Sequence, residues 1–210
     1  MIFFDIETAP LPEAELQAIM PPFDPESVKT GNIKDPEKIT AKIAESKAAY
    51  EADFRENAAL DPLTGRVLCI GLLQGIKFTL LDNPEESQLL SEFWLRHVIP
   101  GRKMVGFNVF LFDLPFLIRR SWKHSIQIPP GVRKGRYWGD DFIDLREQWQ
   151  LGDRQAHGSL DSISKHLGVG AKTGTGKDFA NLWATDRDAA VEYLKNDLVL
   201  TAAIAGRMVV

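Results

Sequence analysis

The chain has 210 residues, of which 44% are hydrophobic and 26% charged, so it has the composition of a globular protein with a sizeable core. Its net charge of −4 and sequence pI near 5.6 argue against a protein that coats nucleic-acid duplexes through overall positive charge. Its single cysteine, Cys69, excludes an internal disulfide. Without a long apolar run or a leader sequence, we expect a single domain in the cytoplasm with no membrane partner.

The first predicted strand ends in two acids. The apolar residues Met1 to Phe4 lead into Asp5, and Glu7 follows after one intervening residue. Side chains alternate across a strand, so Asp5 and Glu7 should point to the same side. Two like charges so placed repel each other, and Mg²⁺ or Mn²⁺ is the simplest compensation. The alternative is a strand that emerges into solvent with two acids at its end.

A helical insertion is predicted between the first strand and the second. Prolines are frequent from residue 9 to residue 36, which predicts an irregular surface segment with a short helix at about 13–20. A long amphipathic helix should then follow over about 36–58, because apolar residues recur there at helical spacing. These residues are Ile39, Ile43, Tyr50 and Phe54. The insertion, about residues 20–60, is either a lid on the core or a clamp on a substrate or partner.

Regular sheet structure resumes at residue 66. Residues 66–73 and 77–81 flank a turn at Gln74–Gly75 and predict an antiparallel hairpin. A helix from about Pro84 to Pro100 and a short buried strand at 104–107 should follow. This order of elements is typical of a mixed α/β sheet.

A third acid lies in an apolar segment. Asp113 is surrounded in sequence by aromatic and aliphatic residues, where an unpaired charge would be costly to bury. It therefore needs a cation or a helix N-terminus as its partner. A role as the N-cap of a helix running through Trp122 is the alternative, and it is compatible with metal binding.

A basic stretch with interleaved aromatic residues comes next. Phosphate-binding charge and rings on which bases can stack suit nucleic acid, although an ordinary solvated surface has the same composition. Its members are Arg119, Arg120, Trp122, Lys123, His124, Arg133, Lys134, Arg136, Tyr137 and Trp138. The acids near the last predicted strand, at about 142–145, are expected to be strand-end residues. They are Asp140, Asp141 and Asp144.

A loop rich in glycine, lysine and threonine over about 168–177 is similar to a phosphate-binding loop without matching its pattern. The first glycine of that pattern would fall on Ala171 and its Ser/Thr on Asp178, and a predicted helix at 160–167 precedes the loop instead of a strand. We therefore expect no nucleoside triphosphate site. A mobile loop that reaches substrate phosphates through Lys172 and Lys177 fits the pattern better.

The final helix carries a phenol and an acid at helical spacing. Thr185 is its expected N-cap, and Tyr193 and Asp197 are four residues apart on the apolar face. Both side chains should therefore point toward the sheet, whose first strand ends in two more acids. Burying a phenol and an acid next to two further acids is unfavourable for core packing, so the arrangement favours a chemical role.

Three segments together resemble the exonuclease motifs of the DEDDy branch of the DnaQ-like 3′–5′ exonuclease family, most closely the proofreading domain of family B DNA polymerases. The segments are Asp5 to Thr8, Gly106 to Pro115, and Tyr193 to Asp197. The segment Ser159 to Ile163 also resembles a stretch between the second and third motifs. The resemblance implies an α/β, ribonuclease H-like fold, with a mixed five-stranded sheet, its second strand antiparallel, flanked by helices. The helical insertion departs from the family pattern and leaves a replication or repair partner open.

The resemblance also implies a mechanism, in which two divalent ions, Mg²⁺ or Mn²⁺, promote in-line hydrolysis while Tyr193 orients the attacking water. The implied metal ligands are Asp5, Glu7, Asp113 and Asp197. The implied substrate-binding residues are Ile6, Thr8, Asn108, Phe112 and Leu114. The implied function is 3′–5′ exonuclease action on single-stranded or frayed DNA ends, releasing nucleoside 5′-monophosphates. The alternatives are an exoribonuclease of the same fold and a non-catalytic nucleic-acid-binding module.

Overall fold

A computed structural model describes residues 1–134, 136–153 and 155–209. The chain divides into two compact units. The sheet unit comprises Met1–Thr8 and Val67–Val210, and the insertion unit comprises Ala9–Arg66. The insertion predicted at about residues 20–60 lies inside the second unit. No helix in the described part of the chain is long and apolar enough to cross a membrane.

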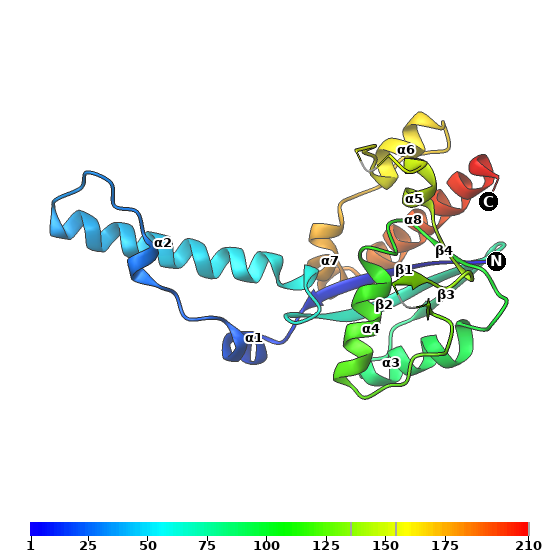
Figure 1. Cartoon of the computed structure of the whole chain (residues 1–210), viewed down its shortest axis with the longest axis horizontal. Coiled ribbons are helices and arrows are strands. Elements are labelled where there is room, and N and C mark those ends of the chain that lie inside the picture. The colour runs from blue at the N-terminus through cyan, green and yellow to red at the C-terminus, as the bar shows by residue number, and fades with distance from the viewer. Residues whose placement is uncertain (135, 154, 210) are drawn as a thin grey trace. The chain divides into compact units, whose positions relative to one another are not determined.

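The sheet unit is built on a five-stranded sheet with the strand order β3-β2-β1-β4-β7 (Figure 1). Strands β1, β4 and β7 run parallel, with Ile2 opposite Met104, whereas β2 and β3 form the predicted antiparallel hairpin. The prediction of a mixed sheet is therefore confirmed. The strands are β1 (Ile2–Pro10), β2 (Gly65–Gln74), β3 (Lys77–Leu81), β4 (Met104–Gly106) and β7 (Phe142–Asp144).

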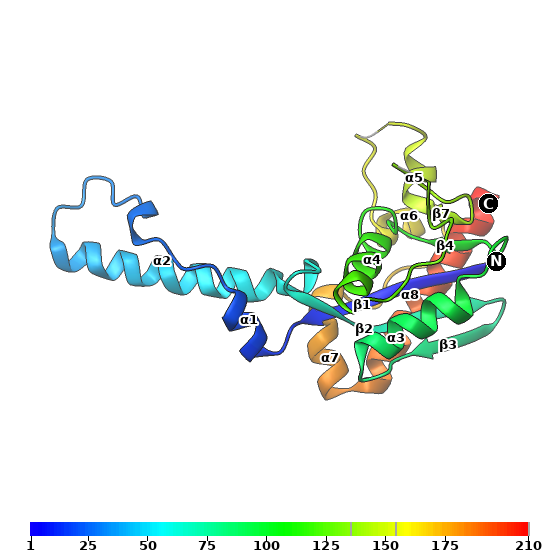
Figure 2. The same ribbon diagram turned by 60° about the horizontal axis from the view of Figure 1, so that its bottom comes forward.

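Helices cover both faces of this sheet. They are α3 (Glu86–Glu92) with a π-helical turn (Phe93–His97), α4 (Asp113–Lys123), α5 (Leu145–Gln150), α6 (Leu160–His166), α7 (Phe179–Thr185) after a 3₁₀ turn (Gly176–Asp178), and α8 (Arg187–Met208). Figures 1 and 2 show α4 and α8 on opposite sides of β1. A separate two-stranded sheet joins β5 (Arg133–Lys134) to β6 (Tyr137–Trp138).

The alternation of β1 divides the core between the two faces. Phe4 is fully buried in one cluster with Leu89, Phe93 and Phe116 from the α3 and α4 side, and each such burial contributes about 1.5–3 kcal/mol. Phe3, one residue away, packs on the other cluster, which α5, α6 and α8 supply. The acids at odd positions of β1 therefore share the face that α8 covers.

The insertion unit contains α1 (Glu13–Ile19), a 3₁₀ turn (Pro25–Ser27), α2 (Pro36–Asn57) and a second 3₁₀ turn (Ala58–Leu60). Asp35 caps α2, because its side chain accepts a hydrogen bond from the backbone N–H of Glu37 at 3.0 Å. Tyr50 donates its hydroxyl proton to the Pro21 carbonyl at 3.1 Å and packs against Phe23. No residue of α2 is buried, so the predicted apolar stripe remains partly exposed.

Candidate active site

Strand β1 presents Asp5 and Glu7 on one side, as its alternation predicts. Ile2, Phe4 and Ile6 point into the cluster with α3 and α4, and the two acids point the other way. Glu7 is buried and Asp5 is half-buried, so neither carboxylate is a freely solvated residue at a strand end. The alternative of two acids ending in solvent is therefore wrong.

Helix α8 brings the second part of the site to the same face. Tyr193 and Asp197 lie one turn apart, and both are buried, as the sequence predicts. The expected N-cap is wrong by one residue. Thr185 ends α7 and donates its hydroxyl to the Asn181 carbonyl, while the Asp186 side chain accepts from the backbone N–H of Ala189 and caps α8.

Asp113 is the first residue of α4, and its carboxylate turns toward β1. Its Oδ1 accepts a hydrogen bond from the backbone N–H of Ile6 at 3.1 Å. The residue before α4, Phe112, offers no side-chain cap, and no described bond makes Asp113 the N-cap of its own helix. A hydrogen bond therefore links Asp113, the acid of the second motif, to β1, the strand that carries the first motif.

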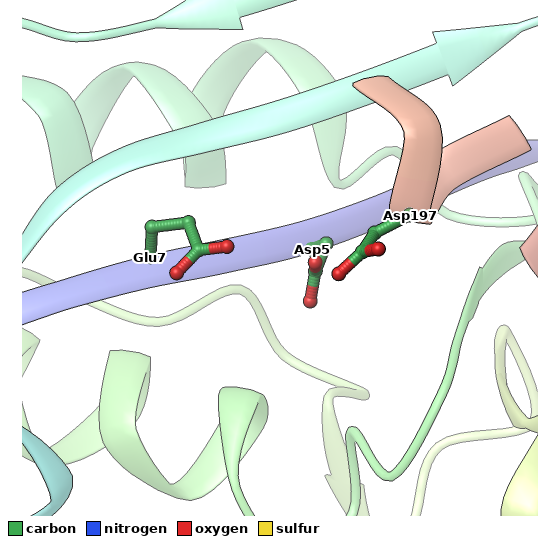
Figure 3. A group of neighbouring side chains, drawn as sticks. All are labelled: Asp5, Glu7 and Asp197. Carbon is green, nitrogen blue, oxygen red and sulfur yellow. The ribbon is translucent and has the colours of Figure 1, made fainter. Parts of the chain in front are cut away.

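These elements place three carboxylates in one cluster. Asp5, Glu7 and Asp197 each offer an oxygen within 4.8 Å of those of the other two (Figure 3). In Figure 3 the Asp197 carboxylate, from α8, lies beside that of Asp5, and Glu7 stands farther along β1. Asp113 lines the same cavity, which has a volume of about 540 Å³.

Burial and the charge of neighbouring acids raise the pKa of the carboxylates. Burial, followed by the charge of Asp197, raises the pKa of Asp5 to about 7. Burial and the charge of Asp5 likewise raise the pKa of Glu7 and of Asp113 well above their usual values. Acids in this environment ionise together only when a cation accompanies them.

The cluster fits a divalent metal. Its donors are carboxylate oxygens, which Mg²⁺ and Mn²⁺ prefer, and one of them, Asp197 Oδ1, is buried with no hydrogen-bond partner. A buried unpaired oxygen costs free energy, and a metal ion would satisfy it. Asp5, Glu7 and Asp197, with Asp113 beside them, are therefore the residues that could hold such ions.

A lysine from the glycine-rich loop also reaches the acids. Lys172 Nζ lies 2.5 Å from Asp197 Oδ2 and 5.0 Å from the centre of the Tyr193 ring. Burial acts against its charge, but the hydrogen bonds with Asp197 and Tyr193 outweigh burial and raise the pKa of Lys172. Its backbone N–H donates to Asp161 on α6 at 3.0 Å, which holds the loop in place. Sequence spacing gave no signal for the Lys172–Asp197 contact.

The same loop passes over the tyrosine. A Cβ atom added at Gly174 would lie 3.3 Å from the Tyr193 ring, so only a residue without a side chain passes here without displacing its neighbour. Burial raises the pKa of Tyr193, against the hydrogen bond with Lys172, so the hydroxyl stays protonated at neutral pH. The loop therefore encloses the phenol beside Asp197.

The residues predicted to bind substrate are only partly brought together. Ile6, Asn108 and Phe112 line the cavity, and Ser159 and Leu160 join them from the start of α6. Thr8 and Leu114 do not line it. Leu114 is completely buried in the core between α4 and the sheet, so it has no surface to offer a terminal base.

Asn108 is held in a fixed conformation. It adopts a left-handed backbone with φ of 63°, which asparagine tolerates better than most residues. Its N–H donates to Asp144 Oδ1 at 2.8 Å, and its Oδ1 accepts from Arg146 Nη1 at 2.8 Å. Asp144 also accepts the backbone N–H groups of Phe110 and Arg146, which agrees with its predicted role at a strand end. No pattern in the sequence indicates a role for Arg146.

The basic stretch, which begins within α4 at Arg119, is not one continuous nucleic-acid surface. Arg120 is buried and forms an ion pair with Glu86 at 2.6 Å, and His124 Nε2 lies 2.8 Å from the same carboxylate. Burial alone would raise the pKa of Glu86, but these hydrogen bonds lower it. Trp138 stacks on Phe110, whereas Trp122 and Tyr137 are exposed.

Comparisons with known proteins agree with this architecture. Residues 63–209 match the model of a family described as a predicted 3′–5′ exonuclease related to the exonuclease domain of PolB. This range includes Asp113, Tyr193 and Asp197, while Asp5 and Glu7 precede it. An uncharacterized protein of Methanocaldococcus jannaschii is 30% identical over an alignment of 159 residues that covers 70% of this chain and 87% of that protein.

A solved structure supports the fold. The family B DNA polymerase of the hyperthermophilic archaeon Pyrobaculum calidifontis aligns with a TM-score of 0.60 and 14% identity over 99% of this chain. The chain spans 24% of that polymerase. At this identity the likeness concerns the fold alone, and it agrees with the α/β, ribonuclease H-like architecture that the sequence implied.

Proposed function

Because the chain belongs to the family of predicted 3′–5′ exonucleases related to the exonuclease domain of PolB, we propose that it is a metal-dependent 3′–5′ exonuclease. Its substrates are single-stranded or frayed DNA ends, and its products are nucleoside 5′-monophosphates. The observation that carries the proposal is the convergence of Asp5, Glu7, Asp113 and Asp197 on one cavity with Tyr193. A non-catalytic binding module would have no need to gather four acids that repel one another in one cavity.

Two divalent ions, Mg²⁺ or Mn²⁺, would be held by the four carboxylates. When bound, such ions supply Lewis acidity and stabilise the charge that develops at the phosphorus. The backbone holds these acids in position. Asp113 is positioned by the Ile6 N–H and Asp197 by its helix, so each presents its oxygens without a large rearrangement.

Tyr193 orients the attacking water through its hydroxyl. Its raised pKa favours a hydrogen-bonding role over proton abstraction, because the phenol keeps its proton throughout the neutral range. Phe112, which is partly buried and lines the cavity, offers a ring against the terminal base. The enclosing loop lies against the tyrosine ring at Gly174.

The substrate is tested by digesting end-labelled single-stranded DNA and RNA of the same sequence with Mg²⁺, with Mn²⁺ or with EDTA. We expect digestion of DNA with either metal and none with EDTA. Faster digestion of RNA would make the protein an exoribonuclease, since discrimination at the 2′-hydroxyl depends on pocket geometry. Binding without digestion under all metal conditions would instead indicate a non-catalytic module.

The polarity of cleavage is tested on blocked and circular strands. A terminal nucleotide must enter the cavity that Phe112 and Ile6 line, so a blocked 3′ end should protect the strand. Cleavage of circular single-stranded DNA at a comparable rate would make the protein an endonuclease.

A further inference from the structure

Two cations line the active-site cavity within the described part of the chain, and they are held differently. Lys172 is already paired with Asp197 at 2.5 Å. Arg146, from the first turn of α5, forms no ion pair with an acid among the described residues, and its Nη1 donates only to the neutral amide oxygen of Asn108. Among the described residues, the guanidinium therefore brings to the cavity wall a charge that has no direct ion pair.

The position of Arg146 is fixed by surrounding hydrogen bonds. Asp144 accepts the backbone N–H groups of Arg146 and Asn108, at 2.9 and 2.8 Å, and so fixes both residues at the end of β7. Asn108, whose backbone is in the left-handed conformation, then accepts a hydrogen bond from the guanidinium through its Oδ1. The Arg146 Nε is buried and has no hydrogen-bond partner. Ordering a charged side chain with an unsatisfied donor is unfavourable unless an anion accompanies it.

The anion that suits this place is a phosphodiester. A guanidinium presents donors in a planar fork that matches phosphate oxygens, and it remains charged at every working pH. The hydrogen bonds that fix Arg146 come from Asn108 and Asp144, whereas the four acids of the proposed metal site belong to β1, α4 and α8. Two separate parts of one cavity thus suit two different groups of a substrate.

We propose that Arg146 binds an internucleotide phosphate of the substrate strand other than the phosphate that is cleaved. The inference rests on the proposed exonuclease function and adds to it a second point of attachment for the strand. The scissile phosphate lies at the acids, and the next part of the strand extends past Asn108 to Arg146. Arg146 is thus a substrate-positioning residue.

The experiment scans the strand for the phosphate that Arg146 binds. Single-stranded oligonucleotides each carry one uncharged methylphosphonate, at successive linkages from the 3′ end, and their Kd is measured in Ca²⁺ for wild type and Arg146→Met. We expect one linkage, not the scissile one, at which the methylphosphonate weakens binding to wild type by about tenfold or more and to Arg146→Met by about twofold or less. Arg146→Lys should restore part of the difference.

A minimal substrate separates this role from damage to the active site. The p-nitrophenyl ester of thymidine 5′-monophosphate carries the scissile phosphate and no other. The loss of kcat/KM in Arg146→Met should be at least about tenfold larger on the oligonucleotide than on the ester. The matched control is Arg96→Met, which removes an exposed arginine paired with Glu92 away from the cavity and should respond to every linkage as wild type does.

Three outcomes would overturn the inference. Arg146→Met could respond to each methylphosphonate as wild type does, or the linkage that it ignores could be the scissile one. Equal losses on the ester and on the oligonucleotide would also contradict it, because they would indicate a general defect. Failure of the proposed function is distinguishable from these, since wild type itself would then neither bind nor digest the unmodified strand.

Discussion

The carboxylate of Asp113 accepts a hydrogen bond from the backbone N–H of Ile6, 107 residues earlier in the chain, at 3.1 Å. Ile6 separates Asp5 from Glu7, so this bond joins the acid that begins α4 to the strand that carries the first two acids. Asp197 completes the group from α8. The site thus depends on three elements held together by the sheet core, and the following predictions test its parts.

Burial of the acids and repulsion among them should destabilise the protein at high pH when metal is withheld. The pKa of Asp5 is raised from 3.8 to about 7, so the folded protein binds more protons than the unfolded chain between these pH values. The stability that this group contributes is therefore fully present below about pH 4 and is lost as the pH rises through 7. In EDTA at pH 8, Asp5→Asn should melt about 4 °C or more above wild type, since 1 kcal/mol shifts Tm by about 2–4 °C at this chain length.

The control for this prediction is the same comparison at pH 5, where wild-type Asp5 is largely protonated and the Tm difference should shrink. Mn²⁺ should raise the wild-type Tm more at pH 8 than at pH 5, because its ligands must be ionised. A wild-type protein as stable as Asp5→Asn at pH 8 would show that burial and the neighbouring acids do not disfavour the charged form of Asp5.

Removing the charge of Lys172 should strengthen metal binding. Its Nζ lies 2.5 Å from Asp197 Oδ2, and a cation so close to a ligand opposes the approach of a divalent ion. We expect Lys172→Met to lower the Kd for Mn²⁺, measured by calorimetry, by at least about threefold. Lys195→Met is the matched control, because Lys195 lies on α8 and pairs with Glu192 outside the cavity. Weaker Mn²⁺ binding in Lys172→Met would contradict the electrostatic argument.

Tyr193→Phe should separate packing from chemistry. The ring keeps its contact with Phe179, 5.9 Å between centres, so the loss of the hydroxyl should cost about 0.5–1.5 kcal/mol of stability. The water-orienting role predicts a fall in kcat of at least about tenfold, with the Kd for single-stranded DNA in Ca²⁺ nearly unchanged. A normal kcat in this variant would leave the hydroxyl without a catalytic role.

The buried ion pair between Glu86 and Arg120 should matter for stability and not for catalysis. Its partners are 9% and 2% exposed, and removing one leaves a charge buried without its counter-ion. Glu86→Ala should lower the free energy of unfolding, measured in urea, by about 3–5 kcal/mol. Glu92→Ala, which breaks an exposed pair with Arg96 at 3.5 Å, should cost about 0.5 kcal/mol or less beyond helix propensity. Similar losses in the two variants would contradict this account of the core.

The sequence predicted those parts of the fold that repeat a pattern over several residues. The alternation of β1 placed Asp5 and Glu7 on one side, and the spacing of α8 placed Tyr193 and Asp197 on its buried face. Short elements carry too few residues for a period, so β5, β6, α5 and α7 were not predicted. The N-cap of α8 was misplaced because Thr185 and Asp186 are both suitable caps, and only the end of α7 decides between them.

Contacts between segments that are distant in the chain could not be predicted from periodic patterns in the sequence. Arg120 and His124 were assigned to a basic stretch, and only tertiary packing turns both toward Glu86. Lys172 reaches Asp197 because Asp161 anchors its loop, and Arg146 reaches the cavity because Asp144 and Asn108 hold it. None of these contacts leaves a periodic signal in the sequence.

The most direct test of the central claim is the time course of a 5′-labelled single-stranded DNA in Mg²⁺ with wild type and with Asp113→Asn. The variant keeps an oxygen to accept the Ile6 N–H but loses the charge of a metal ligand. Wild type should shorten the strand one nucleotide at a time from its 3′ end, and EDTA should stop it. Asp113→Asn should be slower by about a hundredfold or more while remaining folded. Digestion by the variant at a near wild-type rate, or release of the 5′ label before the strand shortens, would contradict the account.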